Sequence, residues 1–211
     1  MKVAPSILTA NFIDLRKDIE SIEKDADLLH VDIMDGHFVS NISFGPGIAE
    51  QISKITDLPL DIHLMVTNPL DWLDKVAFPS TEFITVHAEA DRFAESLKRI
   101  RFINKKAGIC IKPNTPLSVI EPYLSKVDLV LVMGVEPGYG GQAFIQSQLQ
   151  KIKVLSEIKQ KNGYTYEIEV DGGINATTAK QCYEAGATIL VAGTYIFNFA
   201  DRKERIDSLR P

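Results

Sequence analysis

Short apolar runs recur along the chain at fairly even intervals, and longer segments of mixed polarity separate them. A run that is apolar almost throughout is typical of a strand buried on both faces, as in a parallel sheet covered by helices. The pattern predicts eight such strands, each four to six residues long: Val3–Ser6, Leu28–Asp32, Leu60–Met65, Phe83–His87, Ala107–Ile111, Leu129–Met133, Ile168–Asp171 and Ile189–Ala192.

The segments between these runs have helical spacing. The first, Ile13–Lys24, has an apolar stripe opposite its charged residues, formed by Ile13, Leu15, Ile19 and Ile22. The same reasoning predicts six further helices: Ile48–Ile55, Leu70–Phe78, Phe93–Ile103, Leu117–Leu124, Leu149–Lys159 and Thr177–Ala185.

Alternating strands and helices predict an α/β fold, a single (β/α)₈ TIM barrel over residues 1–211. Asn175 has the residue type of an N-cap for the seventh helix, and Gly186 that of its C-terminal stop. A doubly wound open sheet is the competing architecture. The barrel is favoured because polar residues follow nearly all the strands, whereas an open sheet concentrates them at one switch point.

Composition and charge limit the kinds of partner and the cellular location that we expect for this protein. The net charge is −5 and no Lys/Arg run is present, which argues against a nucleic-acid or membrane surface. No segment has the length of a membrane span, and Met1–Ser6 lacks the apolar stretch of a signal peptide. The two cysteines, Cys110 and Cys182, lie in apolar segments and are expected to be buried thiols. We therefore expect a cytoplasmic protein.

Histidines and carboxylates gather where apolar strands end, in the segments 30–36, 61–65, 85–87 and 169–173. Residues two apart in a strand share a face, so His30 and Asp32 point the same way, as do His63 and Met65. In a barrel, the carboxyl ends of the strands form the active face. Two imidazoles and two carboxylates from different strands would bind one divalent cation, and the carboxylates would also serve as base and acid.

Glycine-rich segments follow the last three strands, at 136–142, 171–174 and 192–194. Glycines let backbone N–H groups approach an anion closely, and barrels often bind phosphate with the loops after strands seven and eight. Phosphate binding is therefore expected at this side of the rim. Met34, Met65 and Met133 also lie at strand ends and are expected to cap the core and keep water from a reactive intermediate. Three polar residues are expected to be exposed loop residues: His37, Glu89 and Lys112.

Six segments closely resemble ribulose-phosphate 3-epimerases, in register over essentially the whole chain: 4–8 (APSIL), 30–46 (HVDIMDGHFVSNISFGP), 61–66 (DIHLMV), 135–142 (VEPGYGGQ), 170–175 (VDGGIN) and 191–197 (VAGTYIF). The resemblance implies a barrel of the ribulose-phosphate-binding type. It also implies interconversion of D-ribulose 5-phosphate and D-xylulose 5-phosphate, a step of the pentose phosphate pathway, with one divalent metal. A homodimer or homohexamer is a further expectation from the resemblance.

Carried over by position, the resemblance assigns the metal to His30, Asp32, His63 and Asp171. It makes Asp32 and Asp171 the acid/base pair and adds Ser6 and His63 as substrate contacts. The phosphate end of the substrate would bind Gly138, Tyr139, Gly140, Gly141, Gly172, Gly173, Gly193 and Thr194. Zn²⁺ fits the mixed His/carboxylate set, and Fe²⁺, Mn²⁺ or Co²⁺ would also fit.

Three positions depart from the common family pattern. Ser40 stands for a frequent Pro, Gly134 for a Ser or Thr, and Thr194 for a Ser whose hydroxyl it keeps. Gly134 lacks a hydroxyl near the rim, which leaves the choice between pentulose and hexulose phosphates open. The segment 166–171 resembles epimerases of hexulose phosphates such as D-allulose 6-phosphate. A barrel lyase or decarboxylase is disfavoured, because Lys112 has no acidic neighbours in sequence. A non-catalytic phosphosugar-binding barrel is a competing interpretation from a different class.

Overall fold

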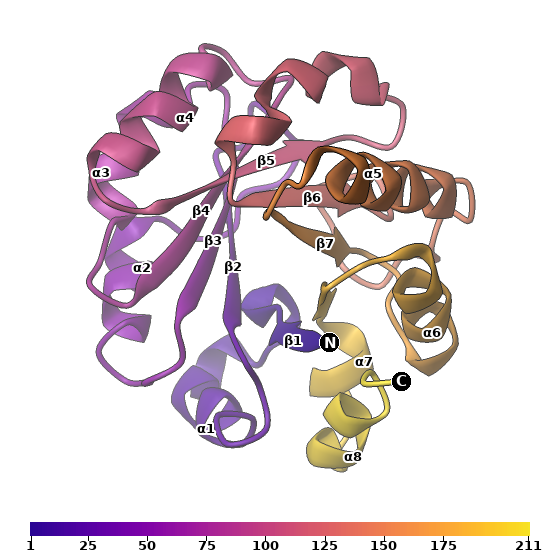
Figure 1. The fold of residues 1–211 in the computed structure, drawn as a ribbon. Coiled ribbons are helices and arrows are strands. Elements are labelled where there is room, and N and C mark those ends of the chain that lie inside the picture. The colour runs from indigo at the N-terminus through magenta and orange to yellow at the C-terminus, as the bar shows by residue number, and fades with distance from the viewer.

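A computed structural model describes residues 1–211 and shows eight parallel strands arranged as a barrel with helices outside it (Figure 1). The sheet order is β1-β8-β7-β6-β5-β4-β3-β2, and a bridge between Ser6 and His30 closes the remaining seam between β1 and β2. The strands are β1 Lys2–Pro5, β2 Leu29–Met34, β3 Leu60–Met65, β4 Thr81–His87, β5 Lys106–Ile111, β6 Leu129–Met133, β7 Glu167–Asp171 and β8 Ile189–Ala192. The predicted (β/α)₈ barrel is confirmed.

Helices surround the sheet in Figure 1, and both termini lie on the side of α7 and α8. The α-helices are α1 Leu15–Glu20, α2 Pro46–Ile52, α3 Leu73–Val76, α4 Phe93–Phe102, α5 Gln148–Asn162, α6 Ala176–Ala185, α7 Thr194–Phe197 and α8 Arg202–Asp207. The 3₁₀ helices are η1 Ile7–Thr9, η2 Phe12–Asp14, η3 Pro69–Asp71, η4 Leu117–Val119 and η5 Glu121–Lys126. None of the helices is both long and apolar enough to cross a membrane.

The core has two main apolar regions, as alternation along the strands requires. The larger one lies between the strands and the helices and includes Val31, Ile62 and Ile168. A smaller one joins residues that face the barrel interior, among them Phe83, Leu131 and Met133. The helices thus cover one face of every strand, and the interior is packed up to the layer where the polar side chains begin.

The first predicted helix is wrong at its start. The helical spacing predicts Ile13 in the buried stripe, but Ile13 is 98% exposed, whereas Ile19 and Ile22 are fully buried. The reason is local: Ile13 lies in the 3₁₀ helix η2, which the Asn11 side chain caps by accepting a hydrogen bond from the Ile13 N–H. A 3₁₀ helix has three residues per turn, so Ile13 is rotated off the face that continues into α1.

Two other predicted helices are shorter or of a different type. Residues 117–124 form η4 and the start of η5 instead of an α-helix, because Pro116 and Pro122 provide no backbone N–H. Residues 70–78 split at Trp72 into η3 and α3. The sequence reasoning also missed the short helices α7 and α8. The signals for α6 are confirmed: Asn175 forms a capping box with Thr178, and Gly186 ends the helix with φ 107°.

Candidate metal and active site

Strand register brings the predicted metal ligands together. β2 and β3 pair so that Asp32 lies opposite His63, and Asp171 is the last residue of β7. One ligand atom from each of His30, Asp32, His63 and Asp171 falls within a group whose members lie within 4.8 Å of one another. These four side chains come from three strands, so they form a compact cluster at the carboxyl end of the barrel.

Hydrogen bonds fix the Asp32 carboxylate within this cluster. The Ser6 hydroxyl donates to Asp32 Oδ2 at 2.6 Å, and His63 Nδ1 lies 3.0 Å from Asp32 Oδ1. His30 Nε2 lies 3.3 Å from the same Oδ1 atom. Ser6 therefore joins the site from the end of β1, as predicted by its position, and its contact in the structure is to Asp32.

The donor set fits a divalent cation. His30 Nδ1 lies 2.5 Å from Asp61 Oδ2, whereas its Nε2 atom is buried without any hydrogen-bond partner. A ring nitrogen held in this way by a carboxylate leaves the other nitrogen as a lone-pair donor, which is the usual arrangement of a metal-binding histidine. Two imidazoles and two carboxylates also match the ligand preferences of Zn²⁺ and related ions.

The two aspartates of the cluster differ in acidity. Burial opposes ionisation of Asp32, but the adjacent imidazoles of His30 and His63 hold its pKa well below the usual range. Burial and the neighbouring Asp32 charge raise the pKa of Asp171 to about 6. Carboxyl groups with such different pKa values are suited to opposite protonation states, which is what an acid/base pair requires.

A second pair of buried carboxyl groups lies against His30. Both Glu169 oxygens and Asp61 Oδ1 are buried without a hydrogen-bond partner. Burial and the Asp61 charge raise the pKa of Glu169 well above its ordinary value. The sequence reasoning assigned no role to either residue. The period-two rule would have found them, because Asp61 shares a face with His63, and Glu169 with Asp171.

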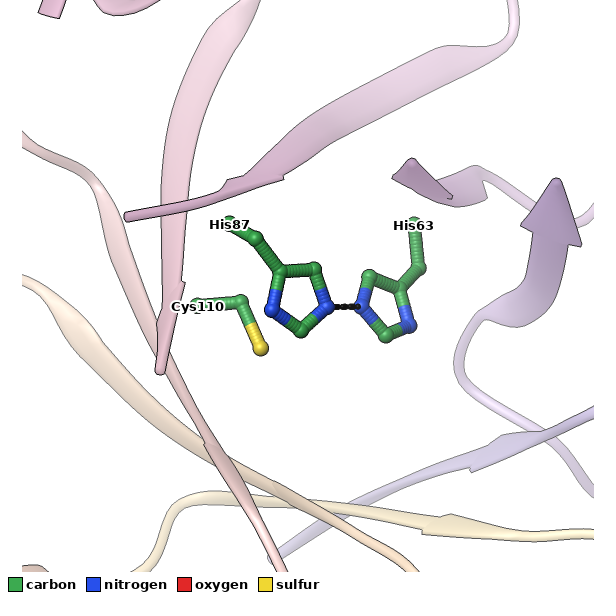
Figure 2. Close-up of side chains that lie close together, drawn as sticks. All are labelled: His63, His87 and Cys110. Atoms are coloured by element: carbon green, nitrogen blue, oxygen red, sulfur yellow. Dashed lines mark hydrogen bonds between the residues drawn. The ribbon is translucent and has the colours of Figure 1, made fainter. Parts of the chain in front are cut away.

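His63 is held on its other side by His87 (Figure 2). The Nε2 atoms of the two rings lie 2.9 Å apart, and Figure 2 shows this interaction with Cys110 nearby. His87 Nδ1 lies 3.3 Å from Glu89 Oε2. Burial lowers the pKa of His87 to about 4, and despite partial burial, hydrogen bonds from His87, Thr115 and Lys112 lower the pKa of Glu89 to about 2. His63 is fully buried and both of its nitrogens have partners, so its predicted contact with substrate stays a prediction.

Of the three polar loop residues, His37 is exposed as expected and bonds to Asp35. Lys112 Nζ lies 4.0 Å from the centre of the Phe38 ring, outside the cluster. Glu89 is an exposed residue, as expected, but its side chain is only 22% exposed and accepts three hydrogen bonds. The sequence feature that could have indicated this contact is the position of Glu89, two residues after His87 at the end of a strand.

A pocket opens above the cluster. Asp32 and Asp171 line it, whereas His30 and His63 lie below its surface. The remaining predicted contact residues line it too: Ser6, Met34, Met65, Met133, Gly138, Tyr139, Gly140, Gly141, Gly172, Gly173, Gly193 and Thr194. The three methionines are nearly fully buried, so they both pack in the core and present apolar surface to the pocket.

The glycine loops interlock closely. Gly173 has φ 68°, and a Cβ atom there would lie 2.3 Å from the backbone nitrogen of Phe144. At Gly134, one of the departures from the family pattern, a Cβ atom would lie 2.6 Å from the Gly172 carbonyl oxygen and 2.7 Å from the Phe144 ring. The loops after β6 and β7 are therefore packed against each other with no room for side chains at these two positions.

Replacing Gly173 by Ala is expected to lower the free energy of unfolding by about 1–3 kcal/mol, because it combines a left-handed backbone with a close backbone contact. Chemical denaturation of both proteins measures the difference. Gly163→Ala is the control: Gly163 also has positive φ, at 66°, but nothing lies within 4 Å of its Cβ position. Equal losses in the two variants would show that the contact with Phe144 contributes nothing.

Solved structures with low sequence identity share the fold. A crystal structure of 3-hexulose-6-phosphate synthase superposes with a TM-score of 0.72 at 17% identity, covering 100% of this chain and 98% of that one. The 3-keto-L-gulonate-6-phosphate decarboxylase of Vibrio cholerae gives a TM-score of 0.72 at 15% identity, covering 99% and 95%. These similarities establish the barrel architecture.

Residues 2–197 match the sequence model of the Ribulose-phosphate 3 epimerase family. The ribulose-phosphate 3-epimerase of Bacillus subtilis is 45% identical, covering 100% of this chain and 98% of that protein. That of Methanocaldococcus jannaschii is 44% identical, covering 100% and 90%. The chloroplastic ribulose-5-phosphate-3-epimerase of Arabidopsis thaliana is 41% identical, covering 99% and 75%. With the barrel and its carboxylate cluster in place, these matches show that the chain belongs to the ribulose-phosphate 3-epimerase family of enzymes.

Proposed function

We propose that this enzyme interconverts D-ribulose 5-phosphate and D-xylulose 5-phosphate by proton transfer at C3. The observation that carries the proposal is the pair of carboxylates, Asp32 and Asp171, which line one pocket as members of one cluster within 4.8 Å. Inverting a carbon next to a ketone requires removal of its proton from one face and delivery of a proton to the other. Two carboxyl groups from separate strands, β2 and β7, supply one group for each face.

In the proposed reaction, an ionised Asp removes the C3 proton and leaves an enediolate of the sugar. The second Asp, protonated at the start, donates its proton to C3 from the opposite face. The two residues end with their protonation states exchanged, and proton exchange with solvent restores them. In the reverse direction Asp32 and Asp171 exchange roles. No nicotinamide is needed, because no hydride is transferred.

His30, Asp32, His63 and Asp171 would hold one divalent cation, with Zn²⁺ the first choice and Fe²⁺, Mn²⁺ or Co²⁺ compatible with the same ligands. Such a cation would supply Lewis-acid stabilisation of the negative charge that develops on the substrate oxygens, worth several kcal/mol. The protein's own part is to keep the His30 lone pair free through Asp61 and to orient Asp32 through Ser6. The three buried methionines exclude water from the deprotonated sugar.

The phosphate end of the substrate is proposed to bind the glycine loops. The backbone N–H groups of Gly172, Gly173 and Gly193 donate to no other backbone group, and all three residues line the pocket. Free N–H groups on neighbouring loops can bind an anion without a cationic side chain. Thr194 adds a hydroxyl at the same place. This arrangement supports a sugar phosphate as the substrate class.

The competing functions make different demands on the site. A lysine-dependent lyase is not supported, because Lys112 does not line the pocket. A hexulose-phosphate 3-epimerase would use the same carboxylates on a substrate one carbon longer. A binding protein would bind phosphosugars without proton transfer. A cytoplasmic location and assembly into a homodimer or homohexamer stay predictions from the sequence.

The test is an exchange assay in D₂O with pentulose and hexulose phosphates and added divalent metals. The proposed function predicts deuterium at C3 together with formation of the epimer, faster for D-ribulose 5-phosphate than for D-allulose 6-phosphate. A preference for the hexulose phosphate would change the proposed substrate but leave the proposed proton transfer unchanged. Binding of either sugar phosphate with no deuterium incorporation under any metal would refute the catalytic proposal.

A further inference from the structure

A row of hydrogen-bonding groups runs from Glu89 through His87 to His63. The row starts at the Glu89 carboxylate, whose Oε2 atom lies 3.3 Å from His87 Nδ1. It continues through the 2.9 Å contact between the Nε2 atoms of His87 and His63, drawn as the dashed line in Figure 2. It ends at His63 Nδ1, which faces Asp32 Oδ1 at 3.0 Å inside the ligand cluster.

The direction of these hydrogen bonds follows from Glu89, because a carboxylate can only accept. Its Oε1 atom accepts from the backbone N–H of Lys112 at 2.9 Å and from the Thr115 hydroxyl. His87 must therefore carry its proton on Nδ1, which leaves a lone pair on Nε2. His63 Nε2 then donates to His87, and its lone pair is left on Nδ1, directed at the cluster, where the Asp32 carboxylate already accepts a hydrogen bond from the Ser6 hydroxyl.

The surroundings of His87 offer no competing partner. His87 is fully buried, and the Phe38 ring packs against it with centroids 4.8 Å apart. The Lys112 ammonium lies over the Phe38 ring and donates no hydrogen bond to the imidazole. Cys110 lies beside His87 in Figure 2, with its sulfur within 4.8 Å of a ring nitrogen of each histidine, but it takes part in no side-chain hydrogen bond. The orientation of His63 thus depends on Glu89 through one intermediate ring.

We propose that Glu89 and His87 are positioning residues that keep His63 in its Nε2–H tautomer, so that Nδ1 is available to a divalent cation. This inference rests on the metal site of the proposed function. The mechanism is the same as for a carboxylate that hydrogen-bonds a metal-binding histidine directly, extended by one imidazole. It gives His63 the counterpart of what Asp61 provides for His30.

Glu89→Gln is the informative variant because its amide can reverse the direction of the hydrogen bonds along the row. The Lys112 N–H can only donate, so the carbonyl oxygen of the new amide takes the place of Oε1 and the NH₂ group faces His87 Nδ1. His87 then accepts at Nδ1 and donates from Nε2, and His63 places its proton on Nδ1, toward Asp32. We expect metal affinity to fall about 10- to 100-fold, the usual effect of losing such an outer partner.

Two measurements test the proposal. Nitrogen-15 NMR of the imidazoles in metal-stripped protein reports the tautomer: His63 is expected as Nε2–H in the wild type and Nδ1–H in Glu89→Gln. Competition between the protein and a chelator for Zn²⁺ or Co²⁺ reports the affinity. Glu89→Asp keeps an acceptor-only group and is expected to retain the Nε2–H tautomer. Glu82→Gln, on the same strand as His87 and paired with Lys106, is the matched control and should change neither readout.

The outcomes separate this inference from the function on which it rests. An unchanged His63 tautomer in folded Glu89→Gln, or unchanged metal affinity, would overturn the positioning role while the metal site stands. A wild-type protein that binds no divalent ion would overturn the metal site and with it this inference. If Glu89→Gln does not fold, the tautomer of His63 in the wild type and in Glu89→Asp decides, and an Nδ1–H form in either contradicts the proposal.

Discussion

Asp171→Asn is expected to lower the rate of epimerisation about a thousandfold, with the barrel still folded. An amide cannot take or give the C3 proton, and general acid/base catalysis contributes factors of this size. The substitution keeps an oxygen ligand and nearly the same shape, in a position where burial and Asp32 raise the pKa of the carboxyl group to about 6. Steady-state kinetics with D-ribulose 5-phosphate measures the loss, and circular dichroism and thermal unfolding confirm that the variant is folded.

The two-carboxylate scheme also predicts a more specific result for Asp171→Asn. With Asp171 replaced, Asp32 still faces one side of the sugar, so C3 of one epimer should exchange with D₂O although no epimer is formed. Asp32→Asn should show exchange in the opposite epimer. Asp57→Asn, an exposed aspartate outside the site, is the control and should behave as wild type. Wild-type epimerisation in either active-site variant would refute the scheme.

Exhaustive removal of divalent metal is the second change with a large expected effect: activity should fall to about 1% or less. The expectation follows from the four-ligand cluster and from the several kcal/mol that a Lewis acid contributes to stabilising a developing oxyanion. The measurement is the epimerase rate after dialysis against a chelator, followed by addition of Zn²⁺, Fe²⁺, Mn²⁺ or Co²⁺ singly. The ion that restores the highest rate identifies the metal that the site uses best.

Restoration by added metal distinguishes loss of the cation from damage to the protein. A protein treated in the same way and immediately reloaded should recover most of its activity. His30→Gln is a suitable companion variant, because it removes the imidazole whose free Nε2 atom belongs to the cluster and should weaken metal retention. Full activity in demonstrably metal-free protein would mean that Asp32 and Asp171 work without a cation.

The sequence was sufficient for the barrel and for the position of the ligand cluster. Buried strands and amphipathic helices have distinct periods, and parallel strands bring their carboxyl ends to one rim, so His30, Asp32 and His63 could be placed on neighbouring strands. Asp171 and the glycine loops were also found at strand ends, and the resemblance to known epimerases then assigned their individual roles. The barrel and the cluster could be predicted because they depend on residue type and spacing, which do not require knowing how the side chains pack.

What the sequence could not provide depends on local geometry. Ile13 fits an α-helical stripe, but a 3₁₀ turn capped by Asn11 exposes it. The partner of a polar side chain also depends on strand register and rotamer. Spacing places Asp61 on the same face as His63, but the β2–β3 register decides that its partner is His30, and a loop conformation brings Glu89 to the amide of Lys112. Residues that act through another side chain are therefore harder to predict than those that face the pocket.

The seam between the first two strands has a consequence for how ligand binding is transmitted to the scaffold. β1 and β2 share no continuous ladder, and at the rim they are joined by the Ser6–His30 bridge and the Ser6 hydroxyl on Asp32. Residues proposed to hold the cation therefore also join β1 to β2 and close the barrel. Binding of the cation should therefore slow amide hydrogen exchange along both β1 and β2. A ligand bound at the rim would in this way reduce local opening along the whole length of the two strands.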